Sequence, residues 1–265
     1  MTDSDQVSII TVSYNAADTI RKTIESVLHQ TYDRIEYIII DGSSTDETYQ
    51  IICEYDKKFA DRNITYIHIS EPNRGIYDAM NKGVGYCSGE WIYYLNANDR
   101  LFQNSTLEQV FSKKYGEQVS CIYGNTWNVK EKKLYFKRAY DIETIYYRVP
   151  FVHQAAFVRR GVMERYRFDM GYKVSADYDL FTRMYVNGEK YKKIDCDIAL
   201  FDLSGISQNS TTEARNEREE IQIKNGLYGR YRVRRFFQNN IIYALKKSRS
   251  IYNVYIFCMN LRRAS

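Results

Sequence analysis

Short apolar runs that alternate with helical patterns are the feature of this sequence that most constrains its fold. Runs of strand length occupy residues 7–13, 36–40, 65–69 and 91–95. Helical periodicity lies between them, and from Ile20 apolar residues recur at i+4, i+7 and i+8. Strands that are apolar on both faces and alternate with helices are typical of a parallel sheet covered on each side. The sequence therefore predicts an α/β fold with a mainly parallel sheet and helices on both faces.

Capping residues predict where two of the helices begin. Ser44 and Glu47 form an S-x-x-E capping box, which predicts a helix that runs to about Phe59. Ser175 is predicted to cap another helix, which ends at Asn187-Gly188. A short helix is predicted at 77–84, and strand-like segments at 119–123, 132–138 and 151–159.

Charge is divided unevenly along the chain, and this division suggests three parts. The formal net charge is +5, but residues 221–265 hold ten Lys and Arg and no acid, so the rest of the chain carries −5. We predict a main domain over 1–207, a polar linker or lid over 208–228, and a basic amphipathic helical tail over 229–265. Such a tail can lie on an anionic membrane surface, or its apolar face can pack on the main domain or a second subunit.

Several classes of protein are disfavoured by the sequence. The five cysteines form no C-x-x-C pair, which predicts a reducing, cytoplasmic location. No signal peptide is recognisable, and no run approaches the ~20 apolar residues that span a bilayer. Association with the membrane would therefore be peripheral, on its inner face. The basic tail has no recognised nucleic-acid motif, and its aromatic residues are spaced for burial, so we predict no nucleic-acid partner.

Polar residues follow three of the predicted strands, where ligands bind in open parallel sheets. These strand ends are 13–15, 41–43 and 96–99. The turn after the first strand has no glycine, which excludes a Rossmann pyrophosphate site, and the sequence has no P-loop lysine. A bound diphosphate would need another source of positive charge, such as Mg²⁺ or Mn²⁺ held by a carboxylate. Asp99 is the acid in position to hold such an ion.

Six segments in this order resemble glycosyltransferase family 2, whose fold is the A-type glycosyltransferase (GT-A) fold. They are VSIITVSYN, IIIDGSSTDET, GIYDAMNKG, SGEWIYYLNANDR, HQAAFVRR and SADYDLFTRM. The resemblance covers about residues 5–207 and looks closest to the branch that builds bacterial surface polysaccharides. It implies a catalytic domain with a donor half at about 1–100 and an acceptor half at about 101–207, followed by the C-terminal helical tail.

The resemblance also implies roles for residues on the donor side. Tyr14 would stack on the base of the nucleotide and Asp41 would accept a hydrogen from it. Asp78 and Asn81 would line the same pocket. Asn98-Asp99 stands in place of a D-x-D-type motif, with Asp99 as the ligand of Mn²⁺ or Mg²⁺. Many members of the family have an acid where this chain has Asn98.

On the acceptor side, the resemblance implies that Asp177 is the catalytic base. Asp177 falls in the first turn of its predicted helix, where the helix dipole favours an ionised carboxylate. Asp179 is the alternative if that helix begins later. His153 and Gln154 fall where the family forms the floor of the acceptor site.

The predicted function is inverting, metal-dependent transfer of a sugar from a nucleotide-diphosphate donor to a hydroxyl group. UDP-sugars are favoured as donors, and a saccharide or a lipid-linked sugar as acceptor. The alternative is a catalytically inactive nucleotide-sugar-binding protein. The only feature that favours it is Asn98, which stands where many family members have an acid. Retention of Asp99 and Asp177 argues against this alternative.

Overall fold

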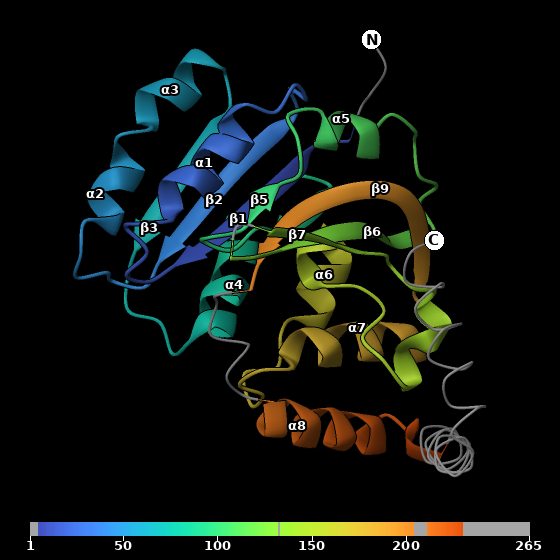
Figure 1. The fold of residues 1–265 in the computed structure, drawn as a ribbon. Coiled ribbons are helices and arrows are strands. Elements are labelled where there is room, and N and C mark those ends of the chain that lie inside the picture. The colour runs from blue at the N-terminus through green and yellow to red at the C-terminus, as the bar shows by residue number, and fades with distance from the viewer. Residues whose placement is uncertain (1–4, 132, 204–210, 230–265) are drawn as a thin grey trace.

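The computed structural model describes residues 5–131, 133–203 and 211–229 of the chain. A nine-stranded sheet has the order β3-β2-β1-β4-β8-β6-β9-β5, with β7 paired to β6 (Figure 1). The strands are β1 (Val7–Ser13), β2 (Ile35–Asp41), β3 (Thr65–Ser70), β4 (Trp91–Tyr94), β5 (Arg100–Leu101), β6 (Val119–Lys130), β7 (Lys133–Lys137), β8 (Ala156–Arg159) and β9 (Lys190–Asp202). The α-helices are α1 (Ile20–Leu28), α2 (Thr48–Cys53), α3 (Asp56–Asp61), α4 (Ile76–Val84), α5 (Thr106–Val110), α6 (Arg160–Tyr166), α7 (Ala176–Val186) and α8 (Thr211–Lys224), and the 3₁₀ helices are η1 (Ile142–Tyr146) and η2 (His153–Ala155).

The sheet is mixed, with a parallel half made by the first strands of the chain. β3, β2, β1 and β4 are parallel neighbours, as the sequence predicts. β8 is antiparallel to both β4 and β6, and β9 runs parallel to β6. Ser13 pairs with Asp41 at the end of the β1–β2 register, and Asp41 pairs with Ser70 of β3. The carboxyl ends of the parallel strands therefore meet at one edge.

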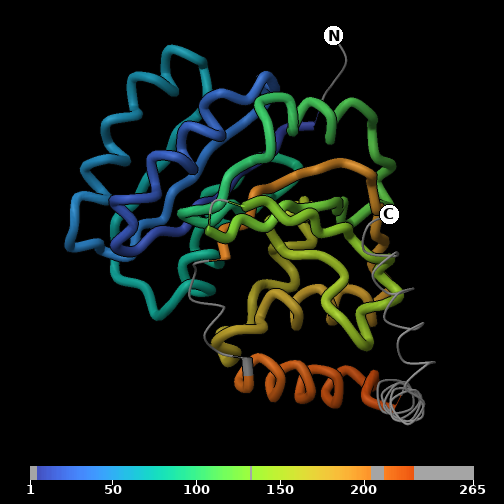
Figure 2. Tube along the Cα trace, viewed as in Figure 1, coloured from blue at the N-terminus to red at the C-terminus, as the bar shows by residue number. Residues whose placement is uncertain are grey.

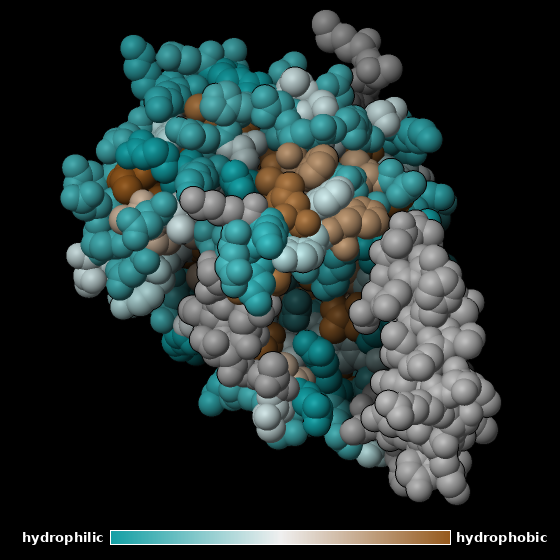
Figure 3. Space-filling view, viewed as in Figure 1, coloured by the Kyte–Doolittle hydropathy of each residue, from teal (hydrophilic) through white to brown (hydrophobic). Residues whose placement is uncertain are grey.

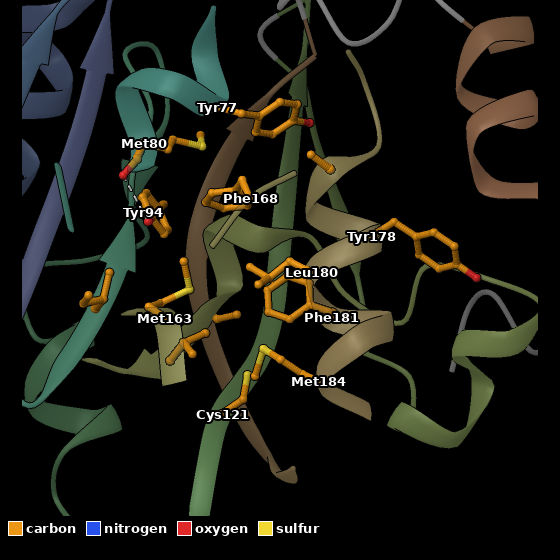
Figure 4. Packing of buried hydrophobic residues seen from close by; sticks show 14 of the residues in the cluster. Tyr77, Met80, Tyr94, Cys121, Met163, Phe168, Tyr178, Leu180, Phe181 and Met184 are labelled. Atoms are coloured by element: carbon orange, nitrogen blue, oxygen red, sulfur yellow. Dashed lines mark hydrogen bonds between the residues drawn. The ribbon is translucent and has the colours of Figure 1, made fainter. Parts of the chain in front are cut away.

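Helices cover both faces of the sheet, which confirms the prediction. Ile9 packs in a core with α1, α2, α3 and α5, whereas its neighbour Ile10 packs in a second core with α4, α6 and α7. Successive side chains of a strand point to opposite faces, so a strand buried on both faces is apolar at most of its positions. In the second core, Met80, Phe168 and Met184 come from different segments; Met80 and Phe168 lie near Tyr94, and Met184 lies beside Cys121 (Figure 4).

The capping box predicted at Ser44 is wrong. Helix α2 begins at Thr48, and a second short helix, α3, follows it in place of one continuous helix. The Ser44 hydroxyl donates to Asp41 at 2.5 Å. Asp46 instead accepts the backbone N–H of Thr48 at 3.0 Å. Ser175 does precede α7 directly, but its hydroxyl donates to the carbonyl of Ala214 at 3.4 Å and does not cap the helix.

Helix α8 lies within the stretch predicted as a polar linker or lid, 208–228. It packs on the outer side of α7, away from the sheet (Figure 2). Buried Ile221 and Gln222 anchor it, and the Glu217 carboxylate accepts the backbone N–H groups of residues 173–175 at 2.7 to 3.1 Å. The predicted tail lies outside the described residues except for Gly229. None of the described helices is long and apolar enough to cross a membrane.

Candidate functional site

Asp41 ties together the ends of three parallel strands. Its carboxylate accepts hydrogen bonds from the hydroxyls of Ser13, Ser44 and Ser70 at 3.1, 2.5 and 2.7 Å, and from the backbone N–H of Ser44 at 2.9 Å. The side chain is fully buried. A nucleotide base that bonded to Asp41 would have to replace one of these donors. The geometry makes Asp41 a support for the loops at this edge.

Tyr14 presents an open aromatic ring at the same edge. Its side chain is 64% exposed, directly after the end of β1. A Cβ atom at position 42 would lie 3.3 Å from Tyr14 Cδ2, so the missing side chain of Gly42 leaves room for the ring. The backbone N–H of Gly42 donates to the Ser13 carbonyl at 2.8 Å, which holds the two loops together.

The two predicted pocket residues of α4 are both bonded to protein groups. Asp78 accepts the backbone N–H of Arg74 at 3.0 Å and its guanidinium at 3.2 Å. These bonds, the backbone bond foremost, lower the pKa of Asp78. The Asn81 amide bonds both the N–H and the C=O of Phe168 at 2.9 Å. Asn81 therefore joins α4 to the segment before α7.

The loop after β4 turns Asp99 into the interior. Asn98 has a φ of 96°, a left-handed conformation that asparagine adopts more readily than most residues. Asp99 is 4% exposed and accepts the backbone N–H of Asp202 at 3.0 Å and the Gln154 amide at 2.8 Å. Burial raises the pKa of Asp99 to about 7, although both hydrogen bonds oppose the shift.

The predicted metal ligand, Asp99, is closed off from solvent in this structure. Asp99 is 4% exposed, each of its oxygens accepts one hydrogen bond from a protein donor, and Gln154, predicted for the acceptor floor, is itself buried. Across 5–131, 133–203 and 211–229, no three His, Cys, Asp or Glu side chains are grouped to hold a metal ion. Each oxygen keeps one lone pair that could bind a cation, so burial, and not the two hydrogen bonds, limits access of a metal ion to Asp99.

Asp177 lies in the first turn of α7, as predicted, with a quarter of its side chain exposed. One oxygen accepts the N–H of Tyr178 at 2.8 Å and the other lies 3.3 Å from Nδ1 of His153. Burial opposes ionisation, but the His153 hydrogen bond and charge and the Tyr178 N–H outweigh it, so the pKa of Asp177 is lowered. Asp179, the alternative base, is fully buried and paired with Arg183 at 2.7 Å.

His153 connects Asp177 to the loop after β4. Its Nε2 lies 3.2 Å from the amide nitrogen of Asn96. Because a carboxylate only accepts, Nδ1–H of His153 donates to Asp177, and the ring links this acid to Asn96. The neighbouring Gln154 donates to Asp99, so η2 joins the two acids. Oδ1 of Asn96 is buried with no hydrogen-bond partner in the part of the chain that the structure describes.

Two cationic side chains act on Asp177 from other elements. Burial lowers the pKa of Lys137, at the end of β7, and the charge of Asp177 opposes this shift. The charge of Arg218, in α8, helps to lower the pKa of Asp177. Sequence reasoning missed Lys137 and Arg218 because no local motif marks them, and it gave no role to Asn96, although it placed that residue at the end of a strand. It is the pairing of β6 with β7 and the packing of α8 on α7 that bring the first two to the site.

Solved structures share the arrangement of strands and helices described above. The structure of S. aureus TarS 1–349 in complex with UDP-GlcNAc has a TM-score of 0.67 and 17% identity, covering 84% of this chain and 66% of that one. Mannosyltransferase PcManGT from Pyrobaculum calidifontis, in complex with GDP-Man and Mn²⁺, has a TM-score of 0.59 and 18% identity, covering 73% and 56%. The chain thus has the GT-A fold of glycosyltransferases and spans slightly less than two thirds of the TarS fragment.

The chain belongs to the family named glycosyl transferase family 2, whose model matches residues 8–181. A PGL/p-HBAD biosynthesis glycosyltransferase of Mycobacterium tuberculosis is 32% identical over 183 residues, covering 68% of this chain and 70% of that protein. An uncharacterized glycosyltransferase of the same species is 28% identical over 229 residues, covering 81% of each. Glycosyltransferase GlyA of Streptococcus pneumoniae is 25% identical over 206 residues, covering 70% of this chain and 29% of that protein. The family predicted from the six segments is confirmed.

Proposed function

We propose that this chain is an inverting glycosyltransferase that uses a nucleotide-diphosphate sugar, with UDP-sugars favoured, to glycosylate a hydroxyl group. The observation that carries the proposal is the ionised, partly open Asp177 at the start of α7, joined through His153 to the loop after β4. The nucleotide sugars in the structures of TarS and PcManGT support a donor of this class.

The proposed mechanism is a single in-line displacement. Asp177 takes the proton of the acceptor hydroxyl as that oxygen attacks the anomeric carbon, and the bond to the diphosphate breaks on the opposite face. The N-terminus of α7 and Nδ1–H of His153 both favour the ionised base. One attack without a covalent sugar–protein intermediate inverts the anomeric centre.

Donor and acceptor are assigned to opposite sides of the loop after β4. The open ring of Tyr14 stacks on the base of the nucleotide, while Asp41, Asp78 and Asn81 shape that pocket from behind through their bonds to protein groups. The acceptor, a saccharide or a lipid-linked sugar of a surface polysaccharide, lies over His153, and the buried Gln154 supports this floor through its hydrogen bond to Asp99.

Metal dependence is the part of the sequence prediction that this geometry supports least. The resemblance implies Mn²⁺ or Mg²⁺ at Asp99, and PcManGT was solved with Mn²⁺. In this chain, however, Asp99 is 4% exposed, and each of its oxygens also accepts a hydrogen bond, from Gln154 or from the Asp202 N–H. No step of the mechanism is therefore assigned to a cation.

Calorimetric titration with UDP, in Mn²⁺ and in EDTA, tests the donor site. We expect UDP to bind with similar affinity in both, because burial of Asp99 keeps a metal ion from reaching its carboxylate. If Mn²⁺ raises the affinity for UDP in the parent protein but not in Asp99→Asn, Asp99 is a metal ligand, as the resemblance implies. If UDP does not bind, titration with GDP and dTDP decides whether the nucleotide or the whole proposal is wrong. Binding without any sugar transfer or donor hydrolysis would favour the inactive nucleotide-sugar binder.

Replacement of His153 by glutamine is expected to lower kcat and leave the affinity for UDP unchanged. The histidine positions Asp177 and lowers its pKa. Without the ring the pKa of Asp177 rises, so the acid limb of the pH–rate profile moves to higher pH. The measurement is UDP release from a UDP-hexose across the pH range. A histidine with only a structural role would lower the melting temperature and leave the acid limb in place.

A further inference from the structure

The hairpin of β6 and β7 carries apolar side chains that the described residues leave uncovered. Leu134, Tyr135 and Phe136 are 54%, 50% and 51% exposed. Because successive side chains of a strand point to opposite faces, three exposed apolar residues in a row leave both faces of β7 open. In the described part of the chain β7 pairs only with β6. Figure 3 shows hydrophobic side chains gathered over the region of β5, β6 and β7.

Basic residues surround these apolar side chains. Residues 130–138 read KEKKLYFKR, with five Lys and Arg and one Glu. Lysines protect edge strands from pairing with other chains, but a protected edge does not need three large apolar residues at its centre. An apolar centre with a basic rim is instead complementary to an anionic bilayer, where apolar groups enter the interface and cations meet the headgroups.

The position of the hairpin gives such docking a purpose. Val129 of β6 pairs with Asp202, whose N–H bonds to Asp99, and the charge of Asp177 acts on Lys137 of β7. The hairpin therefore lies beside the acceptor side of the candidate site. A bilayer that held Leu134 and its neighbours would bring a lipid-linked acceptor within reach of Asp177, a consequence that rests on the proposed function, whereas the docking itself does not.

We propose that the β6–β7 hairpin docks this protein onto an anionic lipid surface through Leu134, Tyr135 and Phe136. Trp127 provides a built-in reporter, since its ring centroid lies 5.2 Å from that of Phe136. The other tryptophan, Trp91, is fully buried and contributes a constant background.

The test mixes the full-length protein with vesicles of phosphatidylcholine, alone or with phosphatidylglycerol, prepared with and without brominated acyl chains. We expect brominated anionic vesicles to quench Trp127, and neutral vesicles to quench it far less. Leu134→Ser/Tyr135→Ser/Phe136→Ser should lower partitioning onto anionic vesicles by about tenfold or more. The matched control is Val186→Ser/Ile223→Ser, which removes comparably exposed apolar side chains from α7 and α8 and should leave partitioning unchanged.

Three outcomes would overturn the docking site. Vesicle binding without quenching of Trp127 would assign the contact to another part of the chain, such as the basic stretch 230–265. Unchanged partitioning of the triple variant would have the same meaning. Self-association that the triple variant abolishes, with no vesicle binding by the parent protein, would show that the hairpin joins two copies of the chain. None of these readouts uses catalytic activity, so failure of the docking site and failure of the proposed function are distinguishable.

Discussion

Replacing Asp177 by asparagine is expected to lower kcat for sugar transfer by about 10²- to 10⁴-fold, the usual contribution of a general base. Asparagine has nearly the same shape and can still accept the Tyr178 N–H, so the first turn of α7 should be preserved. It cannot take a proton from the acceptor hydroxyl. Because Tyr14 and the strand ends that form the proposed nucleotide pocket are untouched, the affinity for UDP should not change.

The measurement is UDP release from UDP-glucose, UDP-galactose and UDP-GlcNAc by hydrolysis, in which water takes the place of the acceptor hydroxyl. Calorimetric titration with UDP measures binding in parallel. The lowered pKa of Asp177 fixes the direction of the pH dependence. Activity should be present above the pKa of the folded protein and lost as the pH falls through it. The asparagine variant should show no such acid limb.

Asp179→Asn is the matched control, because Asp179 is the other acid of the same turn. Its ion pair with Arg183 is buried, so the variant should be less stable, yet the folded fraction should keep its kcat. The opposite pattern, with normal turnover in Asp177→Asn and none in a stable Asp179→Asn, would reverse the assignment of the base.

The parts of the molecule that could be predicted from sequence are those set by local pattern. The apolar residues of β1 and β2 alternate between two cores, and that requirement is visible in any strand buried on both faces. The start of α7 was also predictable, which placed Asp177 in its first turn. Both features depend on residues that are near one another along the chain.

The partners of the site residues could not be predicted, because they come from distant segments. Asp41 is bonded by Ser70, Asn81 by Phe168, and Asp99 by the N–H of Asp202. No spacing rule connects such pairs, since each depends on the completed fold. Helix α8 was missed for a related reason: its sequence is mostly polar, and it is anchored by Glu217 on the backbone of residues 173–175.

Glu36 was predicted only as part of a buried strand, and its replacement by alanine is expected to have a large effect on stability. The carboxylate is buried near the amino end of β2. It accepts hydrogen bonds from the hydroxyls of Ser8 and Ser88 and from the backbone N–H groups of Ser88 and Gly89. Alanine would leave these donors without the acceptor they share, and we expect the free energy of unfolding to fall by about 3 kcal/mol.

Urea unfolding of Glu36→Ala at neutral pH measures this loss, with Glu54→Ala as the control. Glu54 is half exposed and paired with Arg21, so its removal should change stability by less than about 1 kcal/mol. Burial opposes ionisation of Glu36, but its hydrogen bonds outweigh burial and lower its pKa. The stabilisation is therefore present at neutral pH and lost as the pH falls through the pKa of the folded protein. If the difference in the free energy of unfolding between parent and variant stays constant as the pH is lowered, then packing of the Glu36 side chain, and not its charge, stabilises this end of β2. Because this end of β2 is opposite to the edge that carries Asp41, the folded variant should bind UDP as the parent does.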